Sequence, residues 1–162
     1  MNAPLALSPA ALARIDQAIA KYPPDQKQSA VMAALAIAQE EKGWLSVPTM
    51  DFVAQYLEMP PIAVYEVASF YTMYNLKPVG KCKLSICTNL PCALQGANDA
   101  AEHLKKKLGI GFGETTADGA FTLKEAECLG ACGDAPVLLV NDKRMACAMS
   151  ADKLDKLIEE LK

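Results

Sequence analysis

The chain has 162 residues, of which 52% are hydrophobic and 22% are charged, and its formal net charge is −3 at pH 7. This composition is typical of a folded chain of one or two small domains and is too apolar for a disordered one. The acidic excess argues against nucleic-acid binding, which needs basic side chains to neutralise phosphates.

Residues 1–77 predict a small helical bundle without strands. A first helix is expected to begin at Pro9, after the N-cap Ser8, and to end before the helix-breaking pair Pro23-Pro24. Apolar spacing and prolines predict three further helices, at about 26–42, 48–57 and 61–71.

Residues 78–162 change to an α/β pattern. The segment 82–87, CKLSIC, alternates with period two, as strands do. The elements expected after it are a helix from Pro91 to about Leu108, strands at 121–124, 137–140 and 144–148 with a turn at Asn141-Asp142, and a last helix after Ser150. The order strand, helix, strand, strand, strand, helix is compatible with a thioredoxin-like sandwich.

The ends and the apolar runs indicate the compartment. The start, MNAPLALSPAALARIDQ, has neither the basic nor the long apolar segment of a secretory signal. No apolar run approaches the roughly 18–20 residues of a membrane-spanning helix. We therefore expect a cytoplasmic chain, where thiols stay reduced and six cysteines indicate metal or redox chemistry rather than disulfides.

Four of the six cysteines form two spaced pairs, Cys87 with Cys92 (C-x4-C) and Cys128 with Cys132 (C-x3-C). The first pair brackets the loop after the first predicted strand and the second pair follows the second strand. In an α/β sheet two such loops can meet at one edge. Thiolates are soft ligands, and four of them suit a [2Fe–2S] cluster. Gly130 and a helix N-terminus near Pro91 are expected to bring N–H groups toward the site.

Other uses of these cysteines stay open on spacing alone. Structural zinc is the main chemical rival, although zinc sites favour C-x2-C pairs and neither pair has that spacing. Structural disulfides and four unrelated buried cysteines are the remaining alternatives. A dithiol redox site of the C-x-x-C kind is absent from the sequence.

The remaining residues that invite a functional interpretation have simpler ones. Strand register places Cys82 in the core, and alternation with Met145 and Met149 predicts that Cys147 is buried too. The single histidine, His103, is expected to be a solvated helix residue. The glycines after the helix are interpreted as a helix stop and a loop rather than a nucleotide site, and Gly133 is expected to adopt a positive φ.

An aromatic cluster precedes the junction between the two halves. Phe70, Tyr71, Met73 and Tyr74 follow one another closely. They are interpreted either as packing within the core or as a docking surface, because aromatic side chains are enriched at interfaces. Sequence does not separate these two interpretations.

Three segments together resemble a known family. CTNLPC at 87–92, ECLGAC at 127–132 followed by Ala135-Pro136, and ASFYTMYN at 68–75 are similar to the thioredoxin-like [2Fe–2S] ferredoxin subunits in the NADH-dehydrogenase module of respiratory complex I, the NADH-quinone oxidoreductase. The resemblance covers about residues 26–162.

The resemblance implies a [2Fe–2S] cluster held by Cys87, Cys92, Cys128 and Cys132, in a thioredoxin-like domain at 78–162. It implies that residues 1–77 grip a flavin- and NADH-binding subunit, of the F type, with a large Fe–S subunit of the G type nearby. FMN and NADH would lie on the partner and exchange electrons with the cluster, so that the chain would be an enzyme only as part of the complex, on the cytoplasmic side of the inner membrane.

Two other functions are kept beside that of the complex I subunit. One is the equivalent subunit of a soluble NAD-dependent formate dehydrogenase or NAD-reducing hydrogenase. The other, of a different class, is a zinc-stabilised interaction module without redox chemistry.

Overall fold

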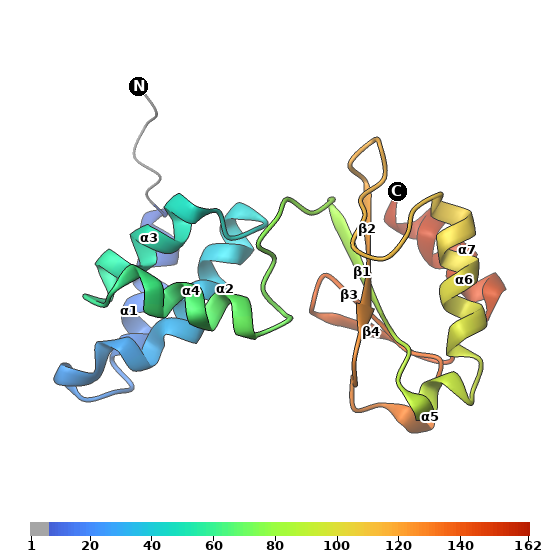
Figure 1. The fold of residues 1–162 in the computed structure, drawn as a ribbon, viewed down its shortest axis with the longest axis horizontal. Helices are drawn as coiled ribbons and strands as arrows, with labels where there is room; N and C mark the ends of the chain where they lie inside the picture. The colour runs from blue at the N-terminus through green and yellow to red at the C-terminus, as the bar shows by residue number, and fades with distance from the viewer. Residues whose placement is uncertain (1–6) are drawn as a thin grey trace. The chain divides into compact units, whose positions relative to one another are not determined.

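A computed structural model describes residues 7–162 (Figure 1). The backbone divides into two compact units, one ending at Pro78 and the other running from Val79 to Lys162. The expectation that the chain begins without a secretory signal concerns in part residues 1–6, which lie outside the described residues. Between residues 7 and 162, no helix is both long and apolar enough to cross a membrane.

The first unit is helical, as predicted. Its elements are α1 (Pro9–Ile19), η1 (Pro24–Ala30), α2 (Val31–Lys42), α3 (Val47–Tyr56) and α4 (Pro61–Phe70). Ser8 caps α1 by accepting the Ala11 N–H, as its position before Pro9 predicts. The α-helices meet in one core cluster, whose most buried members include Ile15, Leu35, Val53 and Val64.

The second helix begins later than the sequence predicts. Residues 24–30 form the 3₁₀ segment η1, in which Gln26 leaves helical geometry at φ −119° and ψ 33°, and α2 begins only at Val31. The segment PDQKQSA buries only Ala30. Because helices in proteins are stabilised mainly by packing an apolar face, this polar stretch gives the α-helix no support.

The second unit contains a four-stranded mixed sheet in the order β2-β1-β3-β4. The strands are β1 (Cys82–Cys87), β2 (Phe121–Ala126), β3 (Leu138–Val140) and β4 (Arg144–Ala146). β1 pairs in parallel with β2 and antiparallel with β3. Asn141 and Asp142, at φ 50° and 58°, form the predicted turn between β3 and β4.

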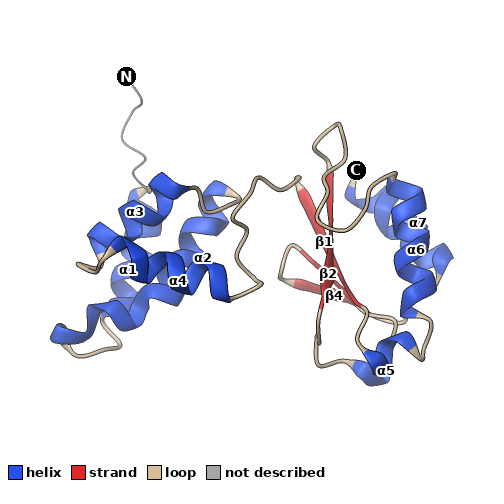
Figure 2. Ribbon diagram, viewed as in Figure 1, coloured by secondary structure: helices blue, strands red, loops and turns tan. Residues whose placement is uncertain are grey.

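Two helices, α6 (Ala97–Leu108) and α7 (Ala151–Leu161), lie side by side on one face of this sheet (Figure 2). Leu84 and Ile86 of β1 pack with Leu104 of α6 and Leu154 of α7 in a second core cluster. Cys82 belongs to this core and is buried, as strand register predicts. The α/β fold class with an N-terminal helical bundle is therefore confirmed.

The predicted helix from Pro91 to Leu108 is wrong, because the structure has two helices there. The four-residue α5 (Leu90–Ala93) is separated from α6 by Gly96, whose φ of 89° is left-handed. A side chain at this φ is strained, so glycine permits the sharp break. Because of this break, α5, which carries Cys92, does not continue along the axis of α6.

Candidate metal centre

The two cysteine pairs lie in loops at the same end of the sheet. Cys87 is the last residue of β1 and lies opposite Ala126, the last residue of β2. Since the two strands are parallel, both chains leave the sheet at this edge. Cys92 follows in α5, and Cys128 and Cys132 follow β2. Residues from both loops share a small apolar cluster formed by Cys87, Cys92, Ala97 and Val137, with Leu129, Ala131 and Ala135 against it.

The four thiols differ in exposure. Cys87 and Cys92 are each only 1% exposed, whereas Cys128 and Cys132 are on the surface. The Cys87 thiol donates a hydrogen bond of 2.7 Å to the carbonyl oxygen of Glu127, in the other loop. The site therefore combines one buried pair of cysteines with one exposed pair.

The Cys92 thiol lies between the two loops. Burial, followed by the neighbouring thiols of Cys87 and Cys132, raises its pKa to about 11. These contributions need both sulfurs close to Cys92. The structure thus brings together three of the four predicted site residues.

Cys128 lies in the same loop as Cys132, in a conformation that depends on glycine. The Gly130 N–H points at the Cys128 sulfur, at an N to S distance of 3.4 Å. Gly130 has a φ of 71°, as expected, but Gly133 does not adopt a positive φ. The expectation for Gly133 is therefore wrong, and only Gly130 needs to be glycine for its backbone conformation.

Side chains tie the two loops together, and sequence reasoning missed them. Thr88 Oγ1 donates a 2.6 Å hydrogen bond to Glu125, and the Asn89 amide donates one of 3.4 Å to Glu127. The available signal was that a hydroxyl and an amide directly follow the first strand, while two acids lie at the end of the second.

The residues fit an iron–sulfur cluster better than a single metal ion. Among the side chains of residues 7–162, no group of three or more Cys, His, Asp or Glu is placed to hold one ion. In a [2Fe–2S] cluster the four thiolate ligands bind two irons, so the ligand sulfurs lie farther apart than they would around a single ion. An all-cysteine donor set and an N–H directed at a ligand sulfur are both typical of such clusters.

The expected helix N-terminus does not contribute as predicted. α5 has four residues, its first N–H, from Leu90, is bonded to the Asn89 side chain, and Pro91 has no N–H. A helix of one turn has no aligned row of peptide dipoles, so it cannot supply the field of a long helix.

Two other residues differ from expectation. Cys147 is exposed rather than buried, because β4 ends at Ala146 and Ala148 turns away with a φ of 50°. His103 is not simply solvated, because its Nε2 lies 2.8 Å from an Asp155 carboxylate oxygen of α7. The contact joins α6 to α7 and lowers the pKa of Asp155.

Part of the aromatic cluster packs in the core and part is exposed. Phe70, Tyr71 and Met73 are exposed, Phe70 by 78%. Tyr74 is buried, and its hydroxyl donates a 2.9 Å hydrogen bond to the Met32 carbonyl oxygen. One aromatic residue therefore packs in the core, and its neighbours form a surface.

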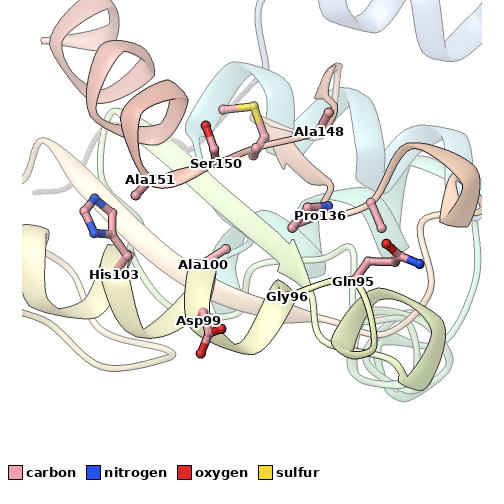
Figure 3. Close-up of a pocket in the computed structure, with 11 residues that line it drawn as sticks. Gln95, Gly96, Asp99, Ala100, His103, Pro136, Ala148, Ser150 and Ala151 are labelled. Atoms are coloured by element: carbon pink, nitrogen blue, oxygen red, sulfur yellow. The ribbon is translucent and has the colours of Figure 1, made fainter.

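A pocket of about 360 Å³ lies between the beginnings of α6 and α7 (Figure 3). Gln95 and Gly96 line it on one side, and Pro136, Ser150 and His103 line it elsewhere. None of the six cysteines lines it. The pocket is therefore separate from the candidate metal centre.

The second unit is a mixed sheet covered by two helices, and its paired cysteines lie in the loops that follow the two parallel strands. This is the architecture of a small α/β protein suited to an iron–sulfur cluster. The chain belongs to the thioredoxin-like [2Fe–2S] ferredoxin family, whose model matches residues 15–162. The family resemblance in the sequence is thereby confirmed, and with it the [2Fe–2S] cofactor of the family.

Curated relatives carry the name of a respiratory enzyme component. The chain is 48% identical over 147 residues to the E-type subunit of NADH-quinone oxidoreductase from Rickettsia conorii, covering 90% of this chain and 87% of the relative. It is 41% identical to "NADH dehydrogenase [ubiquinone] flavoprotein 2, mitochondrial" of Dictyostelium discoideum, over 93% of this chain and 61% of that one.

A solved structure shares the fold. A chain of an NAD+-reducing [NiFe]-hydrogenase in its H2-reduced state superposes with a TM-score of 0.68 and 24% identity. The match covers 78% of this chain and 22% of that one. At this identity the similarity concerns the fold alone.

Proposed function

We propose that this chain is the [2Fe–2S] electron-transfer subunit of the NADH-dehydrogenase module of a respiratory NADH-quinone oxidoreductase. Relatives named as the E-type component of that enzyme are 46–50% identical over most of their length. The observation that carries the proposal is the position of the Cys92 thiol beside Cys87 of its own loop and Cys132 of the other.

Cys87, Cys92, Cys128 and Cys132 would hold the cluster. A bound [2Fe–2S] cluster supplies the capacity to accept and release one electron. The buried sulfurs of Cys87 and Cys92 keep water from one side of the site. The Gly130 N–H stabilises negative charge on the Cys128 sulfur. Cys128 and Cys132 are exposed, so the other side of the site is open to a partner and to solvent. Exposure to solvent also helps to set the reduction potential of a bound cluster.

The chain's work then depends on redox groups outside it. We assign FMN and NADH to a flavin-bearing subunit of the F type, with a large Fe–S subunit of the G type as a further neighbour. The helical unit would grip the partner through Phe70, Tyr71 and Met73, which are exposed. As part of that complex, the chain would lie on the cytoplasmic side of the inner membrane.

The ligand assignment is tested by serine variants. Cys92→Ser and Cys128→Ser are each expected to abolish or strongly shift the EPR signal of the reduced cluster, because serine replaces a soft thiolate with a hard oxygen. Cys147→Ser is the matched control, since this exposed cysteine lies outside the two pairs. An unchanged signal in Cys92→Ser or Cys128→Ser would contradict the assignment.

The functional context is tested by the proteins that copurify with the chain. A flavoprotein together with membrane subunits is expected. A molybdenum or nickel subunit in their place would favour the formate dehydrogenase or hydrogenase alternative. A colourless protein that carries stoichiometric zinc after anaerobic preparation would favour the zinc module.

A further inference from the structure

Polar side chains line the face of the sheet that is turned away from α6 and α7. The two helices cover one face (Figure 2), and Leu84 and Ile86 of β1 pack against them. Successive residues of a strand point to opposite faces, so Lys83, Ser85 and Cys87 point away from the helices. Lys83 and Ser85 are nonetheless buried, at 3% and 8% exposure. The candidate ligand Cys87 therefore lies at the end of a buried polar row along β1.

The neighbouring strand β2 adds a second lysine to this face. Lys124 is the partner of Ser85 in the parallel register, so it shares the face of Ser85 and Cys87. Neighbouring strands lie about 4.8 Å apart and rise about 3.3 Å per residue, which puts the Lys124 Cα roughly 8 Å from the Cys87 Cα. Lys124 is also partly buried. Its charge is therefore close to the cysteine site and only partly solvated.

The two lysines share this face with one carboxylate. The Lys83 Nζ lies 2.5 Å from a carboxylate oxygen of Asp142, in the turn between β3 and β4. Burial, followed by the charge of Lys83, lowers the pKa of Lys124, whereas the charge of Asp142 raises it. These effects need all three groups close together, and two of the three are positive. We call Lys83, Lys124 and Asp142 the lysine patch.

The patch also borders the segments of the chain that hold the cysteine pairs. The segments 84–104 and 125–142 contain all four candidate ligands and no lysine or arginine. Lys83 precedes Cys87 by four residues, and Lys124 precedes Cys128 by four. The last positive side chain before each pair of ligands therefore belongs to the lysine patch.

Reduction of a cluster adds negative charge next to this patch. With four thiolate ligands, the net charge of a [2Fe–2S] site goes from about −2 to about −3 on one-electron reduction, and the partner's flavin supplies the electron in the proposed function. A nearby positive charge stabilises the reduced form more than the oxidised form, and more strongly where water is excluded. The burial of Lys83 and Ser85 limits solvent screening along this face.

We propose that Lys124 raises the reduction potential of the cluster and so favours electron transfer from the flavin to this chain. The inference rests on the proposed function, because it needs a cluster at the four cysteines. The charge of Lys83 is offset by Asp142 at 2.5 Å, so Lys124 supplies the net effect of the patch. A purely structural patch, in which the Lys83–Asp142 pair only ties β1 to the turn after β3, would leave the potential unchanged.

The test is an EPR redox titration of the full-length, cluster-loaded chain at pH 7. Lys124→Met removes the charge and keeps an unbranched side chain. It is expected to lower the potential, so that the ratio of reduced to oxidised cluster at the wild-type midpoint falls about fivefold. Lys124→Gln should do the same, while Lys124→Arg keeps the wild-type potential. Lys106→Met, on the exposed side of α6, is the charge-matched control and should leave the potential unchanged.

The shape of the EPR signal shows in each variant that the ligands are intact. A wild-type potential in both Lys124→Met and Lys124→Gln would overturn the inference and leave the proposed function standing. A shift of equal size in Lys106→Met or Lys124→Arg would also overturn it, because the effect would then not depend on a charge at this position. A wild-type chain whose cluster is not reversibly reduced by one electron would overturn the proposed function, and the inference with it.

Discussion

At the scale of single residues, Cys92 shows why the cluster and the folded site depend on each other. Burial beside two other thiols holds its pKa at about 11, so the thiol is protonated at neutral pH. A ligand sulfur must lose that proton, and metal binding displaces it. The Cys92 thiol is thus protected from oxidation before loading, because the thiolate is the reactive form.

Gly130 and Gly133 offer a matched pair of substitutions. Gly130→Ala is expected to destabilise the protein by roughly 1–2 kcal/mol, because alanine is strained at a φ of 71°. Gly133→Ala is expected to be nearly neutral, because a methyl group there meets no atom within 4 Å and the φ is not positive. Urea unfolding of the cluster-loaded variants measures both. Equal losses at the two positions would show that the backbone strain argument is wrong.

At the scale of elements, one carboxylate joins the start of α1 to the end of α2. Glu41 accepts hydrogen bonds from the Ser8 hydroxyl at 2.6 Å and from the Ser8 N–H at 3.0 Å. The Ser8 hydroxyl bond, followed by Lys42, lowers the pKa of Glu41 from 4.5 to about 2. Because the folded pKa lies below the unfolded one, this contact stabilises the fold above about pH 4.5 and is lost as the pH falls toward 2.

Glu41→Gln is therefore expected to lower the free energy of unfolding at pH 7, with a difference from wild type that shrinks below pH 4.5 and vanishes near pH 2. The single tryptophan, Trp44, lies three residues away and reports unfolding of the helical unit by its fluorescence. Ser8→Ala should reproduce part of this pH-dependent loss. A difference between wild type and Glu41→Gln that is constant from pH 7 to pH 2 would refute the role of this carboxylate.

The sequence predicts the elements in which apolar residues recur with a clear helix or strand period. It does not predict the features that leave no such pattern. The alternation in 82–87 predicts β1, and proline and serine positions predict the starts of α1 and α7. The break at Gly96 was missed because one glycine is compatible with a helix interior. Cys147 was misplaced because β4 is only three residues long, which leaves no face pattern to follow.

For the site, the position of each cysteine pair after a predicted strand indicated that the two loops can meet at one sheet edge. They do meet there, because β1 and β2 are parallel neighbours whose carboxyl ends lie at the same edge. Spacing could not predict the hydrogen bonds from Thr88 and Asn89 that tie the loops, since these depend on side-chain direction in three dimensions. The assignment of the four ligands stays a prediction until the serine variants are measured.

At the scale of the whole molecule, each unit has a core of its own. The first core cluster draws its residues from Leu7 to Tyr74, and the second draws from Cys82 to Ile158. A fragment of residues 79–162 is expected to fold alone and to carry the cluster, with the EPR signal of the full chain. Cooperative urea unfolding, followed by visible absorption, measures this. A fragment that stays unfolded with iron and sulfide supplied would show that the second unit depends on the first.

The parallel pairing of β1 and β2 also sets the order of events during synthesis. The ribosome releases Cys87 and Cys92 first, and the whole of α6 and β2 must follow before Cys128 and Cys132 exist. Until β2 lies alongside β1, the second pair has no fixed place next to the first. The complete ligand set therefore exists only after β2 and the loop behind it have been made, so cluster loading has to follow synthesis of both strands.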